Sequence, residues 1–416
     1  MKILFTLAFN SFLSRKVSVI LTIICLTLSL TLFTYIDNFR GSAKKSFFNN
    51  AQTGDLILGA KSGEIETLLY VIFQIGTPTN NISWKSLTEI SKHSDVKWII
   101  PISLGDSHKQ YRVLGTTSKY FENIKYKNKS LEFLKGKSFN KNFDVVIGFD
   151  VAKKLNYNLN DKIIIVHGIS SNSLHTDFPF KISGILKKTG TPQDKLIFVS
   201  LEALEAIHKD WKAGVHIGGI KTREKNIEIE NLVPKEVTGA IIKLNSKMKI
   251  FKFQREINNY KPEPLQAIIP GLTLSKLWQI ISFVENILLI ISLMVVIASL
   301  IGMSAILYSN LHLRKNEISL LRVVGASPKV ICQLLVFESF MISFISICLS
   351  ILFIQILNIM LIPFFDNEYG IYLDYNFLSM DNILFFSLLQ PFNCYLLKVT
   401  AMALEDIATI TVQVAN

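Results

Sequence analysis

Three long apolar runs restrict the fold of this chain more than any other feature of its sequence. Residues 17–36 carry no charged side chain, and residues 277–308 and 330–362 each contain a single charged residue. About 20 apolar residues in a helix are enough to cross roughly 30 Å of hydrocarbon. We therefore predict transmembrane helices in all three runs.

A fourth apolar run near the C-terminal end is shorter. Residues 383–397 are apolar but fall short of a full span and include Pro391. A crossing over residues 382–404 is complete only if Lys398 extends to the interface, and the alternative is a re-entrant segment. We expect four transmembrane helices, of which possibly three are complete, followed by a C-terminal tail over residues 405–416.

The distribution of basic residues predicts the topology. Arg15 and Lys16 precede the first run, and the link at residues 309–329 is rich in lysine and arginine. The loop at residues 363–381 has acidic residues and no basic ones. Because basic loops stay in the cytoplasm, the link is predicted to be cytoplasmic, whereas residues 37–276 and the acidic loop are predicted to lie outside.

The first 16 residues are predicted to form an amphipathic helix at the membrane surface. Phe5, Phe9 and Phe12 share one face of such a helix. The apolar run that follows is longer than the core of a signal peptide and has no A-x-A cleavage site after it, so we expect a retained anchor.

The outer segment, residues 37–276, is predicted to be an α+β domain. It has no cysteine, so it folds without disulfides. Turns are predicted at 105–106, 115–116 and 190–192, and the polar stretch 221–231 is expected to divide a lower from an upper part. Strand-like runs are 55–58, 96–101, 111–114, 144–147, 162–167, 180–186 and 196–200, and helical runs are 64–75, 86–94, 151–155, 201–209 and 247–259.

The cytoplasmic link has the pattern of an amphipathic helix. Ile318, Leu321 and Val324 recur at helical spacing, and the helix is predicted to end at Gly325 and Pro328. Its polar side is supplied by Arg314, Lys315, Glu317 and Arg322.

This link resembles the signature of the FtsX-like, MacB-type permeases of ABC transporters. The matching residues are Arg314, Glu317, Leu321, Arg322, Gly325 and Ala326, and further likeness covers residues 54–61, 102–108, 189–192 and 263–270. The resemblance implies one helix, a large periplasmic domain and then three helices. It also implies a bacterial inner-membrane location, a cytoplasmic ATPase dimer as partner, a second permease copy and a possible periplasmic or outer-membrane partner. The family's Pro-Ala-x-x-Ala turn after the fourth helix is missing.

The resemblance makes the link the expected docking site for the ATPase. The docking residues would be Arg314, Lys315, Glu317, Ile318, Leu321, Arg322, Val324 and Gly325. No P-loop motif occurs, so the chain is expected to be a non-catalytic subunit without a cofactor of its own. The alternative reading of the link is an interfacial helix that only sets the topology.

Two acidic residues interrupt the apolar runs. Glu285 and Glu338 are costly in hydrocarbon and are therefore functional candidates. We expect Glu285 to lie near a helix end, where it can extend to the interface. We expect Glu338 to pair with a neighbouring helix or to cap the basic residues below it.

Other function classes have weaker support. The formal charge of +12 is scattered, without a nucleic-acid motif. Asp106 with His108, and His175 with Asp177, could hold zinc, but no H-E-x-x-H motif or cysteine cluster accompanies them. The sequence lacks the G-x-S-x-G motif that would suggest a hydrolase. It also lacks the internal repeats that would suggest a secondary transporter. The main alternative is a membrane-anchored binding or sensor protein that acts through its outer domain without an ATPase.

Overall fold

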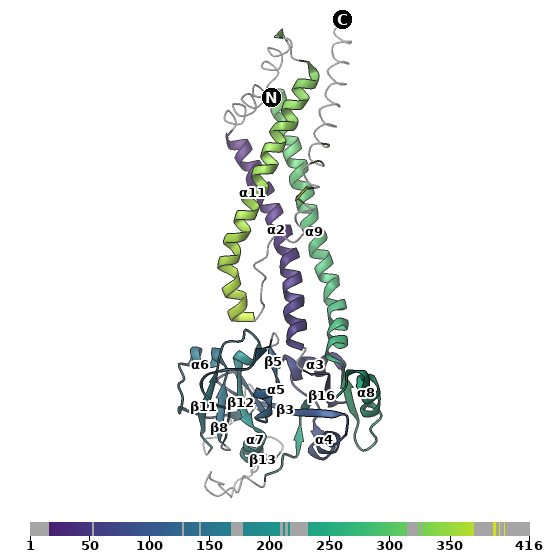
Figure 1. The fold of residues 1–416 in the computed structure, drawn as a ribbon. Helices are drawn as coiled ribbons and strands as arrows, with labels where there is room; N and C mark the ends of the chain where they lie inside the picture. The colour runs from purple at the N-terminus through teal and green to yellow at the C-terminus, as the bar shows by residue number, and fades with distance from the viewer. Residues whose placement is uncertain are drawn as a thin grey trace. The chain divides into compact units, whose positions relative to one another are not determined.

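The computed structural model divides into two compact units, which are described separately (Figure 1). The helix unit contains the chain up to Ala43 and Ser282–Phe365, and the sheet unit contains Lys44–Ile281. The structure describes residues 16–51, 54–126, 129–140, 143–167, 178–208, 211–212, 215–216, 232–313, 323–324, 327–369, 386–387, 391 and 395.

The sheet unit is built on an 11-stranded mixed sheet. Its main path runs β17-β1-β16-β3-β4-β12-β8-β11-β7, with β10 paired to β3 and β9 paired to β11. These strands are β1 (Leu56–Ala60), β3 (Val96–His108), β4 (Tyr111–Thr116), β7 (Phe133–Gly136), β8 (Asp144–Ile147), β9 (Lys162–Ile163), β10 (Val166–His167), β11 (Phe180–Leu186), β12 (Leu196–Ser200), β16 (Gly239–Leu244) and β17 (Leu265–Ile268).

Short strand pairs and helices complete the sheet unit. The pairs are β2 (Ile82–Ser83) with β15 (Glu236–Val237), β5 (Lys125–Tyr126) with β6 (Lys129–Ser130), and β13 (Trp211–Lys212) with β14 (Val215–His216). The helices are α3 (Glu64–Ile72), α4 (Trp84–Ser91), α5 (Lys119–Asn123), α6 (Phe149–Leu155), α7 (Leu201–His208) and α8 (Ile250–Asn258), with 3-10 turns η1 (Pro192–Lys195) and η4 (Lys247–Lys249).

Both faces of the sheet are covered around β1, and the sequence of β1 reflects this. Leu56 and Leu58 point to one face, where they join a core cluster with α4 and α8. Ile57 points to the other face and packs in a second cluster with α3 and α5. Because successive side chains of a strand alternate between faces, a strand covered on both sides is apolar throughout.

The long strand β3 connects the two halves of the sheet. Its first part pairs with β16 and its second part with β4, and the register shifts between Leu104 and Ser107. The turn predicted at 105–106 is therefore wrong, because Gly105 lies inside β3 at this irregularity. The turn predicted at 115–116 is also wrong. Gly115 lies in β4, where an added Cβ would approach Leu204 of α7 to 2.8 Å.

Most of the predicted strands and helices of the outer segment are confirmed, with two differences. The predicted strand 162–167 is split into β9 and β10, because its ends pair with different strands, β11 and β3. Three members of the sheet, β7, β16 and β17, are absent from the predicted strands. The predicted divider at 221–231 lies outside the described residues.

Three helices of the chain are long and apolar enough to cross a membrane, among the residues that the structure describes. They are α2 (Lys16–Ala51), α9 (Pro270–Leu313) and α11 (Pro328–Tyr369). The predicted spans lie inside these helices, each of which extends beyond its span at both ends. Most of residues 382–404 lies outside the described residues, as does the predicted helix over the first 15 residues.

Candidate functional site

The link predicted to be cytoplasmic joins α9 to α11. Helix α9 is described as far as Leu313, and α11 begins at Pro328. Of the predicted docking residues, only Val324 is described. It is 80% exposed, and the neighbouring Val323 is 87% exposed. The others, Arg314, Lys315, Glu317, Ile318, Leu321, Arg322 and Gly325, lie outside the described residues.

Glu285 forms an ion pair between two helices of the helix unit. Its Oε2 lies 3.0 Å from Nε of Arg40 on α2, and the Glu285 side chain is only 13% exposed. The expected position near a helix end is wrong, because α9 begins at Pro270, about four turns earlier. Sequence reasoning missed Arg40. It follows the first apolar run closely, and Glu285 lies early in the second, so the two were candidates to meet at one membrane boundary.

Glu338 lies at the start of a buried polar stripe on α11. Glu338 is 7% exposed as a whole residue. The serines that follow it on this stripe are fully buried: Ser339, Ser343, Ser346 and Ser350. These serines recur every three or four residues, so they share one face of the helix. Small residues on one face allow transmembrane helices to approach closely. The serine spacing is visible in the sequence, but the sequence does not show which helix packs against these serines.

Helix α2 runs beside α9 and α11 (Figure 1), and its hydroxyl groups contact both of these helices. Toward α11, Thr27 donates to the carbonyl oxygen of Ser346, and the hydroxyls of Thr31 and Ser350 share a hydrogen bond of 3.1 Å. Toward α9, the hydroxyl of Ser29 bonds to that of Ser299. Helix α2 is therefore the common packing partner of α9 and α11.

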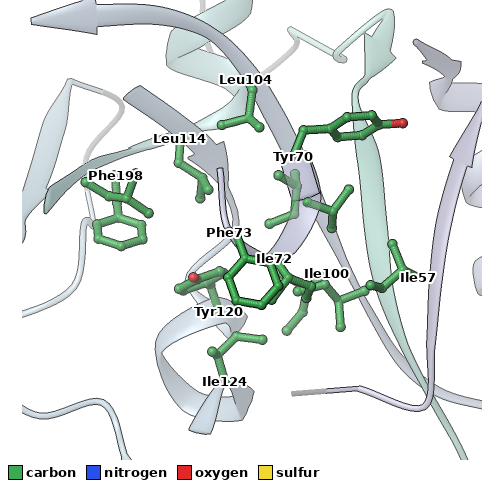
Figure 2. Packing of buried hydrophobic residues seen from close by; sticks show 14 of the residues in the cluster. Ile57, Tyr70, Ile72, Phe73, Ile100, Leu104, Leu114, Tyr120, Ile124 and Phe198 are labelled. Atoms are coloured by element: carbon green, nitrogen blue, oxygen red, sulfur yellow. The ribbon is translucent and has the colours of Figure 1, made fainter. Parts of the chain in front are cut away.

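Within the sheet unit, the outer ends of α2 and α9 are fixed by an aromatic cluster. The ring of Phe47 on α2 lies 5.3 Å from Phe73 and 6.1 Å from Trp278 on α9. Leu274 is fully buried in a core cluster. Figure 2 shows other members of this cluster, among them Phe73, Tyr120 and Ile124. Lys276 pairs with Glu64 of α3 at 2.7 Å. These helix ends, Lys44–Ala51 and Pro270–Ile281, are called the helix roots below.

Among the described residues, the candidate metal ligand His108 is engaged by protein groups. Nδ1 of His108 lies 2.6 Å from the carbonyl oxygen of Ile164, and Nε2 lies 2.8 Å from the hydroxyl of Tyr157. Burial lowers the pKa of His108, which favours the neutral ring that donates through Nδ1 and accepts at Nε2. Asp106 pairs with His208 at 3.4 Å. The lone pair of Nε2 is thus already used, and His175 and Asp177 lie outside the described residues.

Two domain families match the chain. The MacB-like periplasmic core domain matches residues 17–260, and the FtsX-like permease C-terminal domain matches residues 289–402. No curated protein matches the chain.

Two solved structures are similar to parts of the chain. The extracellular domain of the noncanonic ABC-type transporter YknZ from Gram-positive bacteria shares 14% identity, with a TM-score of 0.31, over 51% of this chain and 98% of that chain. The periplasmic region of MacB from Actinobacillus actinomycetemcomitans shares 12% identity, with a TM-score of 0.34, over 56% of this chain and 97% of that chain.

The two family matches follow each other along the chain, as the resemblance of the link implies. The first covers more than half of the 416 residues. The second begins inside α9 and extends beyond α11. The chain therefore belongs to the family of ABC transporter permeases that combine a MacB-like periplasmic core domain with an FtsX-like permease domain.

Proposed function

We propose that this chain is the permease subunit of an ABC transporter that couples ATP hydrolysis in a separate cytoplasmic ATPase dimer to movement of its sheet unit. The chain has no P-loop with which to hold ATP phosphates itself, so the energy must come from another polypeptide. The work done is mechanical transmission or export.

The observation that carries this proposal is the continuity of α9. This single helix of 44 residues has a length of about 66 Å and extends from the sheet unit to the cytoplasmic link. At its root, Leu274 is fully buried and Lys276 is paired with Glu64. A helix held at its root transmits a displacement of its other end with little loss, because its backbone hydrogen bonds resist bending. Movement of the link would therefore reach the sheet.

The link would dock on the ATPase through one face of a short helix. Ile318, Leu321 and Val324 would fill an apolar groove, and Arg314, Lys315, Glu317 and Arg322 would fix the register. Exposure of Val324 supports this proposal, since a docking side chain must be free of contacts within its own chain.

Neighbouring valines give a matched test of docking. The full-length chain would be co-expressed with a candidate ATPase sought among the neighbouring genes, and the amount of ATPase that co-purifies would be measured. Val324→Asp should abolish co-purification, as should the double variant Leu321→Asp with Arg322→Asp. Val323→Asp, at an equally exposed position off the docking face, should have little effect. Equal retention of the ATPase by all variants would reject docking at this link. No co-purification with the natural chain would favour the sensor alternative.

The assembly would contain two permease copies, one for each ATPase subunit. It would lie in the bacterial inner membrane, with the sheet unit in the periplasm, where a periplasmic or outer-membrane protein could bind it. Three apolar helices and the basic link support this placement. Disulfide trapping between two copies, with single cysteines along α2 and α9, would test the dimer.

A further inference from the structure

Helix α2 meets α9 at two levels of the helix unit. At one level, the hydroxyls of Ser29 and Ser299 are hydrogen-bonded. At the other, Nε of Arg40 lies 3.0 Å from Oε2 of Glu285. Residue numbers rise along α2 as they fall along α9, so the two helices are antiparallel. The two levels are about 17 Å apart along α2.

The hydroxyl contact between α2 and α9 can break at little cost. Ser29 also donates to the carbonyl oxygen of Cys25 in its own helix, and Ser299 donates to that of Val295. A hydroxyl group has one hydrogen, so these local bonds compete with the bond between the helices. If the helices move apart, both hydrogens still have an acceptor in their own helix, and no polar group is left unsatisfied.

The hydroxyl contacts of α2 with α11 have the same character. The hydroxyl of Thr31 lies 3.1 Å from that of Ser350, but it also donates to the carbonyl oxygen of Thr27 at 2.7 Å. The hydroxyl of Thr27 in turn lies 3.4 Å from the carbonyl oxygen of Ser346. The middle of the helix unit is therefore held by close packing and by hydrogen bonds that can be exchanged for local ones.

The ion pair differs from these contacts because its carboxylate has no second partner. Within the described part of the chain, Arg40 is the one partner of Glu285, whose side chain is only 13% exposed. Separation of the pair would leave a mostly buried carboxylate without a cation between apolar helices, which is strongly unfavourable. The pair therefore resists separation more than the hydroxyl contacts do.

The residue of α2 next to Arg40 contacts the third helix of the unit. The ring of Phe39 lies 5.2 Å from that of Phe365 on α11. Two consecutive residues of α2 thus hold α9 by charge and α11 by an aromatic contact. From Glu285 onwards, α9 continues for about 42 Å to its end at Leu313, and we call this stretch the inner part of α9.

We propose that the Arg40–Glu285 pair is the pivot of the helix unit, with Arg40 as a positioning residue. The pair keeps α9 against α2 at one level, and the exchangeable contacts elsewhere let the two helices turn about it. A displacement of the link would swing the inner part of α9 against α2 and leave the pair in place. This response to the ATPase rests on the proposed function, whereas the pivot itself requires only contacts within the helix unit.

Spin-label distance measurements test the pivot on the full-length chain in nanodiscs without an ATPase. The four native cysteines would be replaced by alanine. The pivot pair of labels is placed at Gly41→Cys and Val284→Cys, and the distant pair at Leu21→Cys and Ala305→Cys. All four positions are exposed, and a Cβ added at Gly41 would meet no atom within 4 Å. We expect a narrow distance distribution for the pivot pair and a broader one for the distant pair.

Variants of the ion pair separate a positioning role from a purely structural one. Arg40→Gln should broaden the distribution of the pivot pair at least about twofold and leave the distant pair unchanged. The charge swap of Arg40→Glu with Glu285→Arg should restore the narrow distribution. As a control, Ser29→Ala with Ser299→Ala removes an exchangeable contact and should leave the pivot pair narrow. Circular dichroism melts would verify that each variant folds.

Three results would overturn the pivot. One is a pivot pair as broad as the distant pair in the natural chain. Another is equal broadening of both pairs in Arg40→Gln, and the third is equal broadening of the pivot pair in Arg40→Gln and in the serine control.

A second experiment adds the candidate ATPase and an ATP analogue that is not hydrolysed. The distance of the distant pair should change on binding, and that of the pivot pair should stay constant. Equal changes in both pairs would overturn the pivot. If neither distance changes, the proposed coupling to the ATPase fails, and the pivot is decided by the result without the ATPase.

Discussion

The sheet unit and the helix unit differ in how closely burial follows residue type. In the sheet unit most of the fully buried side chains are apolar, such as those of Phe198, Phe180 and Leu56. In the helix unit the face of α11 that packs inward carries Ser343, Ser346 and Ser350. Many of the large apolar side chains of the helix unit are exposed, for example Phe283, Phe344 and Met360.

The difference reflects the solvent that each unit faces. Water drives apolar side chains into the sheet unit. Lipid is as apolar as leucine and provides no such force, so small residues that allow close packing, together with interhelical hydrogen bonds, hold helices together. Apolar residue type therefore predicts burial in the sheet unit but not in the helix unit, where Leu26 and Leu30 are buried and Phe344 is exposed.

The same substitution in both units gives the largest contrast. Phe198→Ala empties a fully buried position against Tyr120 and Phe121 and should lower the free energy of unfolding by about 3–5 kcal/mol. Phe344→Ala, at a position 55% exposed on α11, should cost less than about 1 kcal/mol. Thermal melts of the full-length chain in nanodiscs would compare them, and similar costs would contradict the contrast.

Breaking the Arg40–Glu285 pair tests the charged contact of the helix unit. Arg40→Gln leaves Glu285 mostly buried without its cation, but Arg40 is 35% exposed, so we expect a loss of about 1–2 kcal/mol. The double variant with Glu285→Gln should recover part of this loss. Melting temperatures in nanodiscs would measure this recovery. A double variant that is less stable than Arg40→Gln would show that the two charges stabilise the fold independently of each other.

Acidification tests a buried polar group of the sheet unit. Burial lowers the pKa of folded His108 below its ordinary value, so the unfolded chain takes up a proton first as the pH falls. The contribution of His108 to the free energy of unfolding is full above about pH 6.5. Below this pH it is lost, by at most about 1.4 kcal/mol per pH unit. In denaturant melts, the free energy of unfolding of His108→Gln should fall less steeply with decreasing pH than that of the natural chain. Identical slopes would exclude a contribution of His108 to the pH dependence.

The smallest effect is expected from the hydroxyl contacts of the helix unit. Ser350→Ala removes the hydrogen bond with Thr31 and should cost about 0.6 kcal/mol. A double-mutant cycle with Thr31→Val would measure the coupling, which should be of similar size. A coupling of zero would assign the contact to close packing alone.

Much of the sheet unit could be predicted because its strands and helices have strong local patterns. The runs around Asp144–Ile147 and Phe180–Leu186 are apolar and β-branched, and both form strands. Glycine was the least reliable signal, since Gly105 and Gly115 lie inside strands rather than in turns. A glycine needed for close packing looks in sequence like a glycine needed for a turn.

The candidate site was less predictable, because its contacts join distant parts of the chain. The positions of Glu285 and Glu338 were evident as charges in apolar runs. Arg40 as the partner of Glu285, and Phe47 beside Trp278, depend on which helices lie together.

The sequence by itself determined the three apolar helices, the α+β class of the outer domain and the family, because each follows from local composition, periodicity or a contiguous motif. The tertiary structure decided the order of the strands, the partners of Arg40 and His108, and the packing of the helix roots on the core of the sheet unit. These are pairings between residues far apart in the chain. Their energies depend on distance and burial, which local patterns do not specify.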